Sequence, residues 1–430
     1  MRRYWCSGVF LYVVACGVLV QFVLLPHLLP ALNNGNGLLT PSDAEGFHHI
    51  ATEQAALIRQ QGWSAWTLRP TGQSPAGIAS AVYGLTGHSQ PWTLLPVNAA
   101  LWSLSAWILF LILRPLVSSD GRAILSALPF VLAPSALLFL TQIHKDPLVI
   151  AGTLALWLAL TRLVDSRKTL TFRHETGGIL AWMIGGLILL WVGRPYTMFL
   201  ALFGYGLVAL ILIVADIIER RISLAAWGVI ALSVSICLGL GRTKASQDYS
   251  AVGLKVPVGM TNTLDFVFQP SRLGPLDAPF RRLALMRSVY MKAYPNARST
   301  LDENTTLDSS RKVVAYSPRA LQLLLLAPFP GAWLNRESTN PFSVLAHAET
   351  AARYLLFPGL LWLCWRKRRV LAFWTPWLFF IPWGLIYAIT TPNLGTLIRV
   401  RFSLVMMLAS LGTVGTVMLW DTWRQGRRSV

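Results

Sequence analysis

Long apolar runs constrain this chain more than any other feature of its sequence. About ten of them have the roughly 17–25 residues that a helix needs to cross the hydrocarbon core of a bilayer. Because lipid offers backbone groups no hydrogen-bond partner, such runs must be helices. Of the 430 residues, 54% are hydrophobic and only 13% are charged, a balance that a water-soluble domain of this size does not need. We therefore predict an all-α polytopic membrane protein.

The distribution of Lys and Arg orients these runs. Arg2 and Arg3 precede the first run, and basic residues gather in alternate loops, so the positive-inside rule places both chain termini in the cytoplasm of an inner-membrane protein. This bias also accounts for most of the formal charge of +19, and we expect membrane lipids rather than nucleic acid as partners. The expected spans are 4–25, 95–113, 123–141, a span that starts at Pro147, 177–193, 196–218, 222–241, 346–365, 370–389 and 400–420.

The spans divide the chain into three regions. Residues 1–241 form a transmembrane module whose outer loops, 31–93 and 142–146, carry the candidate catalytic residues, and the first of these loops is rich enough in Trp, Gly and Pro to favour interfacial helices. Residues 242–343 form a long extracytoplasmic segment, and 344–430 are C-terminal transmembrane helices. Within the middle region, 320–334 is apolar but short and broken by proline. We expect a re-entrant or interfacial helix there.

Two aspartates, Asp43 and Asp146, are the candidate catalytic residues. Asp43 follows the first span and Asp146 opens the fourth, so the topology brings both to the outer surface. A carboxylate can act as general base toward a sugar hydroxyl, and a second one can orient it or hold a metal ion. The alternative is that each aspartate simply caps the helix that it begins.

Histidines near these aspartates suggest a divalent metal site. His48, His49 and His144 lie in the same outer loops, and with Asp43 and Asp146 they supply suitable ligands. No spacing here has the specificity of a zinc motif such as HExxH. Surface or interfacial histidines are therefore the alternative interpretation.

Cations at the outer ends of spans break the expected charge bias, which makes them candidates for binding a phosphate leaving group. Their alternative role is to extend toward lipid headgroups. A tyrosine beside them could stack on a sugar, although aromatic residues are common at both membrane interfaces. The candidate substrate-binding residues are Glu45, Lys145, Arg69, Arg194, Tyr196, Arg399 and Arg401.

Two short motifs resemble those of a known superfamily. The first is an aspartate, an aromatic residue and an alanine spaced four apart, at Asp43, Phe47 and Ala51; the second is the Asp-Pro-Leu sequence at 146–148. Over about the first 200 residues the chain resembles the GT-C superfamily of polytopic glycosyltransferases, such as the protein O-mannosyltransferases and the bacterial aminoarabinose transferases. The second half looks more like uncharacterised membrane proteins of bacterial surface-polysaccharide clusters.

This resemblance implies a sugar donor carried on polyprenyl phosphate. By the same resemblance Asp43 would be the catalytic carboxylate of the first loop and Asp146 the acidic residue of the second. The sequence departs from the mannosyltransferase pattern in two places, because Ala44 separates Asp43 from Glu45 and Phe47 replaces the usual tyrosine.

The expected function is transfer of a sugar from a polyprenyl-phosphate donor to a surface glycan or glycolipid on the extracytoplasmic face. Two alternatives remain open. A polysaccharide polymerase or ligase would use a polyprenyl-pyrophosphate donor and depend on the arginines more than on Asp43. A transporter or flippase for a lipid-linked sugar would need ionisable residues inside its spans, and the sequence has few, namely Asp216, His347, Glu349 and Arg353.

Overall fold

The computed structural model describes residues 2–40, 42–167, 169, 174–247, 267–269, 274–294, 299–333 and 341–428. Over these ranges the fold is helical, and the only β-type pairings are two isolated bridges. Eight helices in the described ranges are long and apolar enough to cross a membrane. The predicted all-α polytopic membrane fold is therefore confirmed. These helices are α1 with its π-helical continuation η1 (Arg2–Leu19, Val20–Leu28), α4 (Leu95–Leu113), α7 (Asp146–Ser166), α8 (His174–Gly193), α9 (Thr197–Glu219), α10 (Leu224–Gly241), α16 (Leu371–Thr390) and α18 (Phe402–Arg428).

A bent helix pair is apolar enough, when its two parts are taken together, to count as a ninth candidate span. Helix α5 (Asp120–Val131) and the pair η7 (Pro134–Ala136) and α6 (Leu137–Leu140) are bent by 56° where they meet, and together they match the expected span 123–141. Pro134 lies at the break and has no backbone N–H to continue a helix. The chain then enters the short loop that leads to Asp146.

The structure of residues 346–365 differs from the single span that the sequence predicts. It consists of two helices, α14 (Pro341–Leu355) and α15 (Phe357–Arg366), and it is not among the eight apolar helices. Polar residues explain the difference, because α14 carries Glu349 and Arg353, and Glu349 accepts a hydrogen bond from the backbone N–H of Ser135 in η7. The described ranges thus hold eight candidate spans, or nine with the bent pair, where the sequence predicts about ten.

Glycines bring α15 and α18 into backbone contact. A Cβ added at Gly415 would lie 1.8 Å from the carbonyl oxygen of Gly359, so neither helix can accept a side chain at this crossing. Close approach at small residues is a common way to pack helices in lipid, where no hydrophobic force drives them together.

The first part of the predicted segment 320–334 is the end of a buried helix. Helix α13 (Ser310–Leu326) packs against α16 and is not among the spanning helices. Its last carbonyl groups have no partner within the helix, and Arg401 donates hydrogen bonds to those of Leu323, Leu324 and Ala327. Arg401 is therefore the cap of a buried helix end, with only 3% of its surface exposed.

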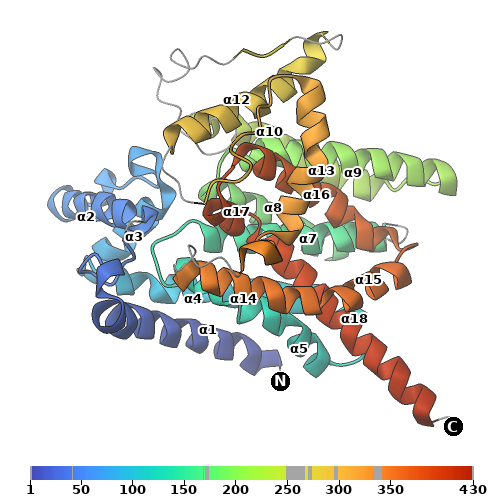
Figure 1. Cartoon of the computed structure of the whole chain (residues 1–430), viewed down its shortest axis with the longest axis horizontal. Coiled ribbons are helices and arrows are strands. Elements are labelled where there is room, and N and C mark those ends of the chain that lie inside the picture. The colour runs from blue at the N-terminus through green and yellow to red at the C-terminus, as the bar shows by residue number, and fades with distance from the viewer. Residues whose placement is uncertain are drawn as a thin grey trace.

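Two further groups of helices cover the end of the bundle that carries Asp43. Helices α2 (Asp43–Gln61) and α3 (Ser74–Thr86) pack together over a small apolar core of their own. Helix α12 (Asp277–Ala293) packs against α13 and α16. Figure 1 shows both chain termini on the side of the bundle away from α2 and α3. Of the predicted segment 242–343, residues 248–266, 270–273, 295–298 and 334–340 lie outside the described ranges.

Candidate active site

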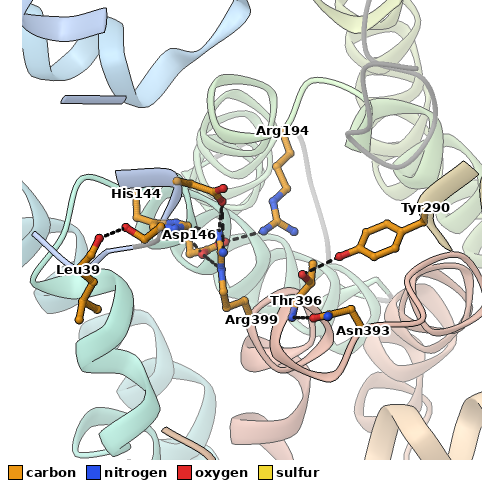
Figure 2. Close-up of polar contacts among 10 residues, drawn as sticks. Leu39, His144, Asp146, Arg194, Tyr290, Asn393, Thr396 and Arg399 are labelled. Carbon is orange, nitrogen blue, oxygen red and sulfur yellow. Dashed lines mark hydrogen bonds and ion pairs between the residues drawn. The ribbon is translucent and has the colours of Figure 1, made fainter. Parts of the chain in front are cut away.

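Four separate parts of the chain meet at one polar cluster, which Figure 2 shows in close-up. Asp43 is the first residue of α2, and Asp146 is the first residue of α7. Arg194 lies in the link between α8 and α9, and Arg399 lies on the short helix α17 (Leu394–Val400). We call Asp43, His144, Lys145, Asp146, Arg194 and Arg399 the polar cluster.

Arg399 joins the two aspartates. Its Nη2 lies 3.2 Å from Oδ2 of Asp43, and its Nε lies 3.1 Å from Oδ2 of Asp146. The expectation that the topology brings these distant carboxylates together therefore holds in the structure: one guanidinium contacts both.

The two aspartates differ sharply in exposure. The Asp146 side chain is 2% exposed and also binds Nη2 of Arg194 at 2.6 Å and Nδ1 of His144 at 2.8 Å. The Asp43 side chain is 54% exposed and uses only Oδ2 to contact Arg399, so Oδ1 has no partner among the described residues. Asp146 thus has the surroundings of an organising residue, whereas Asp43 is open to an incoming molecule.

Simple helix capping does not describe either aspartate. Each occupies the first helical position rather than the cap position, and Ser42 and Lys145 precede them. The carboxylates bind side chains from other elements instead of the backbone of their own helix. A negative charge in the first turn still interacts favourably with the helix dipole.

Two cations of the polar cluster have unused hydrogen-bonding capacity. Nε and Nη1 of Arg194 are buried and have no partner within the described residues. The ammonium of Lys145 likewise forms no hydrogen bond or ion pair with any described residue. Buried donors without partners are costly, so Nε and Nη1 of Arg194 mark a place where an anionic group would be stabilised.

Burial and neighbouring charges set the protonation states. Burial would raise the pKa of Asp43, but the nearby positive charges and the hydrogen bond from Arg399 together outweigh it, so the pKa lies below its ordinary value. Burial and Arg399 together lower the pKa of His144, which is therefore neutral near pH 7. Burial and the charge of Arg194 lower the pKa of Lys145 to about 8. Near pH 7 the polar cluster therefore holds three cations (Lys145, Arg194 and Arg399) and two carboxylates (Asp43 and Asp146), so its net charge is +1.

Buried amides hold the loop before Asp146. Asn98 donates to the carbonyl oxygens of Leu140 and Gln142, and Gln21 donates to that of Thr141. Gln142 in turn accepts a hydrogen bond from the backbone N–H of Leu39, near the start of the loop that carries Asp43. These residues were not predicted from the sequence, although an amide inside an apolar span is a usable signal because it needs a hydrogen-bond partner there.

A second network positions Arg399. The Asn393 side chain caps α17 by accepting from the N–H of Thr396 at 3.0 Å, and the Thr396 hydroxyl lies 2.9 Å from that of Tyr290 on α12. The buried Arg287 donates to the carbonyl oxygens of Leu301 and Ile389, which ties the middle segment to the end of α16. Residues from the middle region therefore fix the orientation of α17.

Several predicted site residues lie outside the polar cluster. Arg69 donates to the carbonyl oxygens of Trp191 and Val192 at the end of α8, and Tyr196 is hydrogen-bonded to Tyr387. Glu45 is exposed and accepts from Thr40, whereas Arg401 caps α13. His48 contacts Tyr83, and His49 contacts Glu53 on the α2 surface.

The residues present do not fit the expected divalent metal site. His48 and His49 have other partners, and Arg399 and Arg194 already occupy the carboxylate oxygens of Asp43 and Asp146. Across the described ranges, no group of three or more His, Cys, Asp or Glu side chains is arranged to hold a metal ion.

Comparison with known proteins identifies a similar fold. No protein-family model matches the chain, and no curated protein matches it in sequence. A solved structure of the archaeal oligosaccharyltransferase AglB from Archaeoglobus fulgidus, in complex with an inhibitory peptide and a dolichol-phosphate, is similar with a TM-score of 0.51 and 12% identity. The match covers 100% of this chain and 52% of AglB, so the chain spans about half the length of that protein. At this identity the likeness shows the fold alone.

Proposed function

We propose that this protein is a membrane glycosyltransferase that takes a sugar from a polyprenyl-phosphate donor. The observation that carries the proposal is the polar cluster, in which a half-exposed carboxylate lies beside cations with unused donors. The shared fold with AglB, whose structure includes a dolichol-phosphate, supports a lipid-linked donor. The acceptor is a surface glycan or glycolipid on the extracytoplasmic face, and the bundle end with α2 and α3 faces that side.

Asp43 acts as the general base in this proposal. Its free Oδ1 accepts the proton of the acceptor hydroxyl as that oxygen attacks the anomeric carbon, and the bond from this carbon to the lipid phosphate breaks. Arg194 and Lys145 stabilise the negative charge on the departing phosphate through charge-assisted hydrogen bonds. A single base is the usual arrangement for inversion of configuration.

The charge of the polar cluster favours a monophosphate donor. A sugar linked to a lipid through one phosphate is a phosphodiester with a single negative charge, and it matches the single net positive charge of the polar cluster. A pyrophosphate donor carries a second charge that the described side chains leave unbalanced. This difference separates the proposal from the polymerase or ligase alternative.

Donor consumption by the purified protein tests the proposal. In lipid nanodiscs with a short glycan acceptor, we expect loss of a polyprenyl-phosphate hexose and release of polyprenyl phosphate, measured by chromatography. The matching polyprenyl-pyrophosphate hexose should remain intact. Consumption of the pyrophosphate donor alone would instead support a polymerase or ligase, and movement of an intact donor across the bilayer without cleavage would support a flippase.

Donor binding should depend on pH through Lys145. Its pKa of about 8 means that the side chain is charged below this pH and neutral above it, so the KM for the donor should rise as the pH increases through about 8. Losing one charge-assisted contact costs about 1.5–3 kcal/mol, so Lys145→Met should raise this KM by about tenfold or more at pH 7. Lys145→Arg should keep a low KM at higher pH. A wild-type KM that stays constant across this range would contradict the role of Lys145.

A further inference from the structure

Arg399 lies where a cation shared by the two aspartates would lie. Its guanidinium contacts Oδ2 of Asp43 and Oδ2 of Asp146, while Oδ1 of Asp146 binds Arg194. Three of the four carboxylate oxygens are therefore already in contact with guanidinium groups. A planar guanidinium can join two carboxylates that would otherwise repel each other.

Adding a divalent ion to this arrangement is unfavourable. Mg²⁺ and similar ions need about six oxygen ligands at close range, and only Oδ1 of Asp43 is left unpaired. The ion would also lie beside the positive charges of Arg194, Lys145 and Arg399, which repel it at short distance. Displacing Arg399 first would leave a fixed cation without its two partners.

We propose that Arg399 is a built-in cation that holds the place between Asp43 and Asp146 which the sequence suggested for a divalent metal ion. This inference rests on the proposed function and deepens it, because it makes sugar transfer independent of added metal. Arg399 keeps Asp43 turned so that Oδ1 faces the acceptor. It also supplies a permanent positive charge next to the departing phosphate.

Binding of Mn²⁺ tests the inference without any sugar substrate. Mn²⁺ is titrated into the purified protein in nanodiscs, and the electron paramagnetic resonance signal of the free ion is recorded. We expect no saturable binding by the wild-type protein at the polar cluster. The Arg399→Ala variant, which removes the guanidinium from Oδ2 of Asp43 and from Oδ2 of Asp146, should bind one Mn²⁺ per chain. The added change Asp43→Asn should abolish that binding.

A matched control is available in the middle segment. Arg319 is paired with Asp302 at 3.0 Å, so Arg319→Ala also removes an arginine from an aspartate, but only one carboxylate becomes free there and no Mn²⁺ should bind. Thermal unfolding verifies that each variant is folded.

Two results would overturn the inference. The first is that the wild-type protein binds Mn²⁺ and that Asp43→Asn abolishes this binding. This result can be observed without any Arg399 variant. The second is a folded Arg399→Ala variant that gains no Mn²⁺ site. Sugar transfer by the wild-type protein should also continue unchanged in a chelator. If no donor is consumed at all, the proposed function fails, while the Mn²⁺ titration still decides the role of Arg399.

Discussion

The Asp43→Asn variant is expected to transfer sugar about 10²–10⁴-fold more slowly than the wild-type protein, which is the usual contribution of a general base. Asparagine keeps the shape of the side chain and a hydrogen-bond acceptor for Arg399, but it cannot take the proton from the acceptor hydroxyl. Initial rates of donor consumption at saturating acceptor measure the effect.

Stability should change little in this variant. The Asp43 side chain is half exposed, and Arg399 retains its contact with Asp146, so the loss should be below about 1 kcal/mol, as for other exposed ion pairs. Glu53→Gln is a suitable control because Glu53 is an exposed carboxylate on the same helix, and its rate should match the wild type. Transfer by Asp43→Asn at more than half the wild-type rate would remove Asp43 as the base.

The Asp146→Ala variant should lose stability rather than chemistry alone. Asp146 is buried and paired with Arg194 and Arg399, and removing one partner of a buried ion pair leaves charge without compensation. Such changes cost about 3–5 kcal/mol, which is enough to unfold a marginally stable membrane protein. Thermal unfolding in detergent and the amount of protein in membranes measure this loss.

A double variant distinguishes the loss of the ion pair from the loss of side-chain volume as the cause of the destabilisation. If the destabilisation comes from unpaired charge, Asp146→Ala combined with Arg194→Met should be more stable than the sum of the two single variants implies. Asp308→Ala is the control, because its pair with Lys312 is exposed and should contribute less than about 1 kcal/mol. An Asp146→Ala protein that unfolds at the wild-type temperature would show that the polar cluster is not needed for the fold.

Apolar run length predicted most of the helical frame because crossing a bilayer requires a fixed number of residues. The exception at 346–365 is informative. Its apolar residues are numerous enough to suggest a span, but Glu349 and Arg353 face protein partners, and the helix breaks at Leu356 before Pro358. The average composition of a segment does not show which of its polar groups will find partners inside the bundle.

The predicted topology also brought Asp43 and Asp146 together, since each aspartate lies next to the end of a span and both of these ends reach the same surface. The separate roles of the arginines could not be predicted from the topology. Arg399 and Arg401 are two positions apart in one short motif, yet Arg399 contacts the aspartates and Arg401 caps α13. Only the packing of α13 and α17 against α16 decides between these roles, and that packing depends on residues such as Arg287, far away in the chain.

The long separation of these partners has a consequence for biosynthesis. Arg399 follows Asp43 by 356 residues and Asp146 by 253, so the ribosome adds it when most of the membrane helices have already been made. Among the described residues, Arg194 is until then the only arginine that is paired with Asp146. Polypeptides that stop short of α17 therefore carry an incomplete ion-pair network even when every earlier helix is inserted.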